Sequence, residues 1–252
     1  MDLLVTALLV FGRLGGLLLV LPGVSARGVP KHVAALGGIA LTATLAPVVP
    51  LAETPEYLGT LILGMAGELF LGIMMGSAVA VIFGAFGMAS ELMEQEMGSR
   101  IPLGPDPFMF SQQGPLGTLA SWLATLSFLL VGLHHDAIQI LGDSFHYLPP
   151  GGVTSLSGGG VVLMEAVSWA LFLGVRLAAP VLALVWMVNV FVAILVKLAP
   201  NMNVFFSIGM VMTNMSGLVL FGLGLPYLLL AHTTAIHEGL DAMTRLVLSA
   251  GR

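Results

Sequence analysis

Residues 64–84 read GMAGELFLGIMMGSAVAVIFG, an apolar segment that holds one charged residue, Glu68. Small residues share its spacing of four positions with Glu68, and they are Gly64, Gly72, Gly76, Ala80 and Gly84. Residues four apart lie on one ridge of an α-helix, and small residues on a ridge let a second helix approach closely. The segment therefore predicts a membrane-type helix with a close neighbour, which is either another helix of this chain or a helix of another subunit.

The composition of the whole chain extends this prediction. Of the 252 residues, 58% are hydrophobic and 8% are charged, and the mean hydropathy is +1.04. Soluble domains carry about 25% charged residues, so lipid or protein must replace water over much of this surface. We predict an all-α, polytopic membrane-type protein with about five to six long apolar helices, some of them kinked or packed as hairpins. The predicted organisation is one helical domain over residues 1–252.

The chain contains several apolar runs of the length that a membrane span requires, which is about 20 residues. They are Leu3–Leu21, Val33–Leu51, Tyr57–Ala89, Leu116–Leu141, Val161–Leu198 and Met202–Ala231. Pro180 lies in the middle of the fifth run, which is either one kinked helix or two packed halves. Pro149-Pro150-Gly151-Gly152 and Gly158-Gly159-Gly160 predict a flexible connector, and a short polar tail is expected after Ala231.

The polar residues form no catalytic or metal-binding pattern. Cysteine is absent, which excludes thiolate nucleophiles and cysteine-ligated metals. His134, His135 and Asp136 are consecutive, so they diverge on a helix and are interpreted as residues at a helix end. His232 and His237 lack the spacing of an H-E-x-x-H zinc site. We predict no enzyme activity, no catalytic residue, no cofactor and no metal, and the lack of a basic run argues against nucleic acid as a partner.

Glu68 and Arg176 are charged residues well inside apolar runs, and Arg13 interrupts the first run. Glu68 is on the glycine ridge, and Arg176 is in the run that contains Pro180. A carboxylate in mid-membrane costs about 2.5–3.5 kcal/mol on insertion scales, so Glu68 should be paired, protonated or next to a polar cavity. Arg176 is the predicted partner. We interpret Glu68 as a buried structural or inter-subunit group, and a proton-relay role is the alternative.

The segment from about residue 101 to 115 contains several prolines and is predicted to be a non-helical loop. Within it, Phe108, Met109 and Phe110 are large apolar residues between the prolines and a polar stretch. Irregular backbone at membrane depth is tolerated only inside protein or along a cavity. Methionine is deformable and phenylalanine is flat, so both suit the closing of a hole that must sometimes open. A pore plug is one hypothesis, and ordinary core filling is the other.

Several short patterns run in order along nearly the whole chain. They are Arg13 with Pro22-Gly23 and Arg27-Gly28-Val29-Pro30-Lys31, Glu68-Leu-Phe-Leu-Gly72-Ile-Met-Met-Gly76 with Gly87, Gln95-Glu96-Met97-Gly98 with Asp106-Pro107, Gly132-Leu-His134-His135 with Ser144-Phe145 and Pro149, Arg176-Leu-Ala-Ala-Pro180, and Pro200-Asn201-Met202-Asn203-Val204-Phe205. Each pattern alone is weak, but the ordered set resembles the FliR family of flagellar export-gate subunits. The injectisome homologues of the SctT/SpaR class share much of the same set.

The resemblance implies a function that composition could not show. It implies a non-enzymatic subunit of the flagellar type III export gate, located in the bacterial inner membrane at the flagellar basal body. With P-type and Q-type subunits such a chain forms the pore for unfolded flagellar proteins, and the B-type subunit, other basal-body proteins and membrane lipid are further expected partners. In the family one loop helps to close the pore, and Phe108, Met109 and Phe110 fall where that plug is expected. The alternatives are the equivalent injectisome subunit, and a secondary transporter with an ion site at Glu68 and Arg176.

Overall fold

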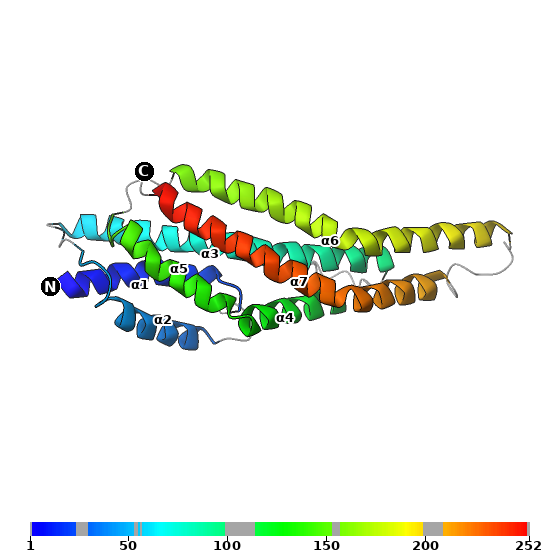
Figure 1. The fold of residues 1–252 in the computed structure, drawn as a ribbon, viewed down its shortest axis with the longest axis horizontal. Helices are drawn as coiled ribbons and strands as arrows, with labels where there is room; N and C mark the ends of the chain where they lie inside the picture. The colour runs from blue at the N-terminus through cyan, green and yellow to red at the C-terminus, as the bar shows by residue number, and fades with distance from the viewer. Residues whose placement is uncertain are drawn as a thin grey trace. The chain divides into compact units, whose positions relative to one another are not determined.

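The computed structural model describes residues 2–23, 30–52, 55, 57–98, 114–152, 157–198 and 209–250. Over these residues the chain forms helices and no strand (Figure 1). The helices are α1 (Asp2–Val20), α2 (Lys31–Leu45), α3 (Leu58–Met97), α4 (Pro115–Leu130), α5 (Leu133–Tyr147), α6 (Ser157–Leu198) and α7 (Met210–Ala250). The predicted all-α fold class is confirmed.

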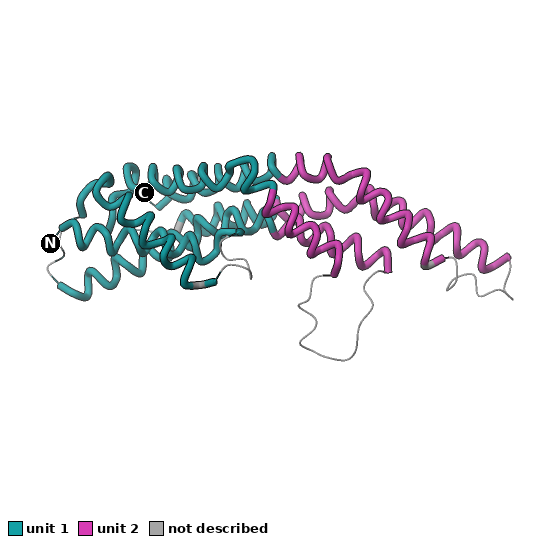
Figure 2. Tube along the Cα trace, turned by 90° about the horizontal axis from the view of Figure 1, so that it is seen from below, with its two compact units in different colours: residues 1–83, 127–169, 233–252 teal, residues 84–126, 170–232 magenta. Residues whose placement is uncertain are grey.

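The helices pack into two compact units (Figure 2). Unit 1 comprises residues 1–83, 127–169 and 233–252, and unit 2 comprises residues 84–126 and 170–232. The long helices α3, α6 and α7 each contribute one part to unit 1 and another part to unit 2. That residues 1–252 act as one export-gate domain stays a prediction.

Within the described residues, four helices are long and apolar enough to cross a membrane, namely α1, α3, α6 and α7. The bent pair of α4 and α5 would make a fifth span if it were counted as one. These helices confirm the polytopic membrane-type character. The second predicted span was wrong in length, since α2 has 15 residues and ends at Leu45. Pro47 follows, and it has no N–H with which to continue the helix.

The predicted helix from Leu116 to Leu141 is two helices in the structure. The α4 helix ends at Leu130, α5 begins at Leu133, and the chain bends by 63° between them. Gly132 makes the break, because its φ of 85° is in the left-handed region. A glycine adopts this conformation without the steric cost that a side chain would bring. The prediction of one continuous helix was therefore wrong.

The substitution Gly132→Ala is expected to destabilise unit 1 by about 1–2 kcal/mol, because Cβ is strained in the left-handed region. Gly142→Ala in α5 is the matched control, since Gly142 is helical and an added Cβ would have its nearest neighbour at 4.0 Å. The control should be neutral or slightly stabilising, because alanine favours helix over glycine. Denaturant unfolding of both variants in detergent, followed by circular dichroism, measures the difference. Equal unfolding midpoints would contradict the assignment of strain to Gly132.

The fifth apolar run is one helix, α6, which continues through Pro180. The alternative of two packed halves is therefore excluded. Residues 149–152 lie outside any helix, but the predicted flexible connector was wrong at residues 158–160, because these glycines lie in the first turn of α6. Gly159 is buried there against Met74 and Leu246. Tight packing orders a glycine-rich segment that would be flexible in isolation.

The last predicted apolar run ends at Ala231 and is followed by a polar tail, but the helix α7 continues through this tail as far as Ala250. Its charged residues are exposed on one face of α7, while apolar residues at helical spacing are buried. The buried face joins a core cluster in unit 1, which consists of Met74, Ala78, Ala166, Ala242 and Leu246. Composition alone indicates polarity here and misses the amphipathic spacing.

Candidate functional site

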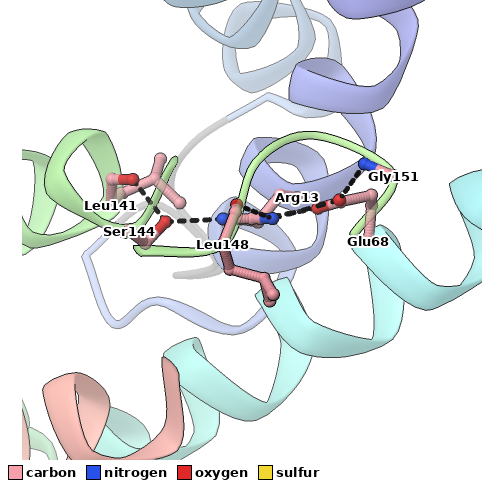
Figure 3. A network of polar contacts seen from close by, with 6 residues as sticks. All are labelled: Arg13, Glu68, Leu141, Ser144, Leu148 and Gly151. Atoms are coloured by element: carbon pink, nitrogen blue, oxygen red, sulfur yellow. Dashed lines mark hydrogen bonds and ion pairs between the residues drawn. The ribbon is translucent and has the colours of Figure 1, made fainter. Parts of the chain in front are cut away.

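Arg13 of α1 and Glu68 of α3 form a buried ion pair in unit 1 (Figure 3). The Nε of Arg13 donates to Oε2 of Glu68 at 2.6 Å, and Nη2 of Arg13 donates to Oε1 at 3.0 Å. Both side chains are 0% exposed. Paired donation from a guanidinium to both carboxylate oxygens is a strong and directional contact. The pair therefore fixes the position of α1 along α3 as well as binding the two helices together.

The surrounding polar atoms complete the hydrogen bonds of the pair. Nη1 of Arg13 donates to Oγ of Ser144 at 2.9 Å, and Nη2 also donates to the carbonyl oxygen of Leu148 at 3.0 Å. The backbone N–H of Gly151 donates to Oε1 of Glu68 at 2.8 Å. Figure 3 shows these contacts converging on the pair from α5 and the turn that follows it.

Two further contacts hold α5 at this centre. The guanidinium carbon of Arg13 lies 4.1 Å from the centre of the Phe145 ring, a distance at which a cation is attracted to an aromatic face. The Ser144 hydroxyl donates in turn to the carbonyl oxygen of Leu141 at 2.6 Å. Buried charges stabilise a fold only when they are paired and their remaining polar atoms are bonded. The pair meets both conditions, so it acts as a structural centre that joins α1, α3 and α5.

The predicted partner of Glu68 was wrong. The carboxylate binds Arg13, whereas Arg176 is an exposed residue of α6 in unit 2. The sequence contains a signal that could have found Arg13, because it lies between Gly12 and Gly16, which repeat the four-residue spacing of the ridge on α3. Two small-residue ridges that face each other bring adjacent charges together. The ion site that a transporter would need at Glu68 and Arg176 is therefore not supported.

The glycine ridge of α3 packs against α1 within this chain over part of its length. A Cβ added at Gly72 would collide with the carbonyl oxygen of Arg13, and one at Gly76 would lie 2.9 Å from the carbonyl oxygen of Leu17. From the other side, a Cβ at Gly16 would collide with the carbonyl oxygen of Leu69. These positions leave no room for a side chain, so the two backbones are in direct contact.

The ends of the ridge are less crowded. A Cβ at Gly64 would make an ordinary contact with Leu9 at 3.5 Å, and one at Gly84 would have no neighbour within 4 Å. Gly84 is exposed and belongs to unit 2. The sequence showed the ridge as continuous, but its close packing against α1 is confined to the middle.

The histidines do not form a metal site among the described residues, where no group of three His, Asp or Glu side chains could hold an ion. His134 is half-buried and its ring centre lies 4.0 Å from that of His135 and 6.2 Å from that of Phe128. Asp136 lies in the first turn of α5 and is exposed. The predicted plug residues Phe108, Met109 and Phe110 lie outside the described residues.

Over the described residues the chain is helical, with four or five apolar helices of membrane-spanning length, and these features define the class of polytopic helical membrane proteins. Within that class, residues 4–239 match the family described as "Bacterial export proteins, family 1". The chain belongs to this family, the family of FliR.

Three relatives bear the same printed name, "Flagellar biosynthetic protein FliR". The protein from Caulobacter vibrioides is 24% identical over 94% of this chain and 95% of its own length. The protein from Escherichia coli K12 is 29% identical over 81% of this chain and 78% of its own. The protein from Pectobacterium carotovorum is 27% identical over 86% of this chain and 82% of its own. The similarity therefore extends over nearly the whole fold.

Proposed function

We propose that this chain is a non-enzymatic subunit of the flagellar type III protein export gate in the bacterial inner membrane. With P-type and Q-type subunits it forms the pore through which unfolded flagellar proteins leave. The alignment with a flagellar FliR over 94% of this chain and 95% of that protein is the observation that carries the proposal. Because the named relatives are flagellar proteins, we propose the flagellar rather than the injectisome system.

The exposed surface of α6 supports a role inside an assembly. Only 17% of its most apolar stretch is buried within this chain. Exposed apolar side chains continue from Val161 to Leu198, and a helix of that length rises about 55 Å at about 1.5 Å per residue. The hydrocarbon layer is only about 30 Å thick, and tilts rarely exceed about 40°. Lipid therefore cannot cover all the exposed apolar side chains of α6, and partner proteins would cover the rest.

Association with partner subunits tests the proposal directly. Tagged chain expressed with P-type and Q-type subunits should co-purify with both in mild detergent. Expressed alone, the same chain should accumulate at a lower level, because part of its apolar surface has no protein cover. A monodisperse and stable monomer that ignores both partners would overturn the proposal. Solute uptake by that purified monomer in liposomes would instead point to a transporter.

The plug hypothesis belongs to the same proposal. It assigns Phe108, Met109 and Phe110 to the closed pore, on the grounds of their large apolar side chains within a proline-containing segment for which the sequence predicts a loop. Irregular backbone at membrane depth is tolerated only within protein or along a cavity.

Replacing Phe108, Met109 and Phe110 together by serine is expected to make cells leak ions while the assembly still forms. Small polar side chains can neither fill the pore nor exclude water from it. Ion permeability of cells that express the complete gate measures the effect, and co-purification checks assembly. The matched control replaces the neighbouring polar triplet, Ser111, Gln112 and Gln113, by alanine. Unchanged permeability in the serine variant would contradict the plug hypothesis but not the proposed role as an export-gate subunit.

A further inference from the structure

Arg176 is an exposed residue of α6 within unit 2, and among the described residues its guanidinium has no ion-pair or hydrogen-bond partner. None of the residues three or four positions away in α6 is acidic, so the helix supplies no carboxylate at the spacing of an intrahelical pair. The one acidic residue of α6, Glu165, already pairs with Arg245. The described part of the chain therefore offers this cation no anion.

The face of α6 that carries Arg176 is otherwise apolar. Between residues 172 and 194, the residues at helical spacing from Arg176 are all exposed, and they are Phe172, Ala179, Ala183, Met187, Val190 and Ile194. Ala179 and Ala183 are four positions apart, and small residues at this spacing let a second helix approach closely. The Arg176 face, defined by these residues, therefore has the shape and polarity that suit the docking of another apolar helix.

Lipid alone does not account for Arg176. In the middle of the hydrocarbon layer a guanidinium without a counterion is costly. At the edge of the layer it could reach lipid phosphate, but exposed apolar side chains continue in both directions, to Val161 and to Leu198. These two stretches of α6 rise about 22 Å and about 33 Å at about 1.5 Å per residue. Hydrocarbon would cover only one of them, so protein must cover the other as far as Arg176.

We propose that the Arg176 face docks an apolar helix of a partner subunit, and that an aspartate or glutamate of this helix pairs with Arg176. The inference rests on the proposed function, since it requires a partner subunit. The same chemistry occurs within this chain, where Glu68 on the glycine ridge of α3 binds the guanidinium of Arg13 in α1. In both arrangements small residues allow close approach and one ion pair sets the register.

The pairing would make Arg176 a determinant of partner choice. An apolar helix that docked on this face without a carboxylate would leave the guanidinium buried and unpaired, which is strongly unfavourable. Apolar contact alone does not discriminate between the many apolar helices of a membrane assembly, whereas a single buried charge does.

Charge reversal at Arg176 tests the pairing, with tagged chain co-expressed with P-type and Q-type subunits. Arg176→Glu should lower recovery of the subunit that docks on α6 by about tenfold or more, because like charges would then face each other in a buried contact. Arg176→Lys keeps the positive charge and should retain most of the recovery. Arg245→Glu is the matched control, since it changes the net charge equally at a side chain that is 51% exposed and pairs within this chain. Recovery with the control should be unchanged.

Rescue identifies the partner residue. Each aspartate and glutamate in the apolar helices of the lost subunit is replaced by arginine in combination with Arg176→Glu, and one combination should restore recovery. Loss that no such replacement restores would overturn the ion pair. Rescue by reversal of an acidic residue of this chain would overturn it as well, and Glu53, Glu56 and Asp106, which lie outside the described residues, are included for this reason.

Phosphatidylglycerol retained by the purified complexes is measured in parallel by mass spectrometry. Normal recovery of both subunits with Arg176→Glu, together with loss of this lipid, would assign Arg176 to lipid phosphate and overturn the docking. Normal recovery with unchanged lipid would overturn it too, and in both cases the proposed function stands. Failure of the unmodified chain to recover either subunit would instead contradict the proposed function itself.

Discussion

Glu68→Ala is expected to lower the free energy of unfolding by about 3–5 kcal/mol, the usual cost of removing one partner from a buried ion pair. The guanidinium of Arg13 would remain buried, at 0% exposed, and its Nε and one N–H of Nη2 would have no acceptor. The N–H of Gly151 would lose its acceptor as well. Unfolding by sodium dodecyl sulfate in mixed micelles, followed by circular dichroism, measures the loss.

The exposed pair of Arg245 and Glu165 is the control for this prediction. Its N–O distance is 3.2 Å and its side chains are 51% and 59% exposed. Exposed pairs contribute about 0–1 kcal/mol, so Glu165→Ala should be nearly neutral. If Glu68→Ala costs no more than Glu165→Ala, the buried pair is not a structural centre of unit 1.

Replacing both Arg13 and Glu68 tests whether unit 1 needs the ion pair itself or only the absence of a single unpaired buried charge. Arg13→Met combined with Glu68→Met should recover most of the stability that Glu68→Ala loses, since apolar replacement of a whole buried pair is often neutral. Recovery would be incomplete, because Ser144, Leu148 and Gly151 also lose bonding partners. A double variant less stable than either single variant would contradict this account.

Gly16→Ala is expected to be the most damaging small substitution in α1, with a loss of about 1–3 kcal/mol or more from overpacking. The added Cβ would collide with the carbonyl oxygen of Leu69 and lie 2.8 Å from the backbone nitrogen of Ile73. Backbone cannot rotate away as a side chain can, so the two helices must separate. Gly15→Ala is a control one residue away, because a Cβ there has no neighbour within 4 Å.

The control should gain up to about 1 kcal/mol from helix propensity, so the two alanine variants are expected to differ in sign. Gly72→Ala offers a second test from α3, since its Cβ would collide with the carbonyl oxygen of Arg13. Because separation of the helices also pulls Arg13 from Glu68, the effects of Gly16→Ala and Glu68→Ala should not add. Purely additive losses in the double variant would show that the ridge and the ion pair are independent.

The glycine contacts and the ion pair belong to one arrangement. Close approach at Gly16 and Gly72 brings the α1 and α3 backbones together, and the paired hydrogen bonds of Arg13 fix their register. Small residues give a membrane protein close packing without specifying register strongly, whereas a directional polar contact specifies it. The combination explains why a charge is retained on an otherwise apolar ridge.

The sequence by itself determined the features that repeat locally. Apolar runs fixed the all-helical membrane class, the four-residue spacing of small residues marked a close-packing ridge on α3, and ordered short patterns indicated the family. Such features can be predicted from sequence because helical period and hydrophobicity depend on residues within a few turns of each other.

Only the tertiary structure decided which distant residues meet. The partner of Glu68 lies 55 positions away at Arg13, and the choice between Arg13 and Arg176 depends on the register of α1 on α3, which no local pattern encodes. The carboxylate of Glu94 likewise accepts the backbone N–H groups of Leu116 and Gly117, which are 22 and 23 positions away. The structure also showed that Gly132 adopts the left-handed conformation and breaks the apolar run, which composition does not reveal. The helical end of α7 depends on packing, because one buried face outweighs the average polarity of a segment.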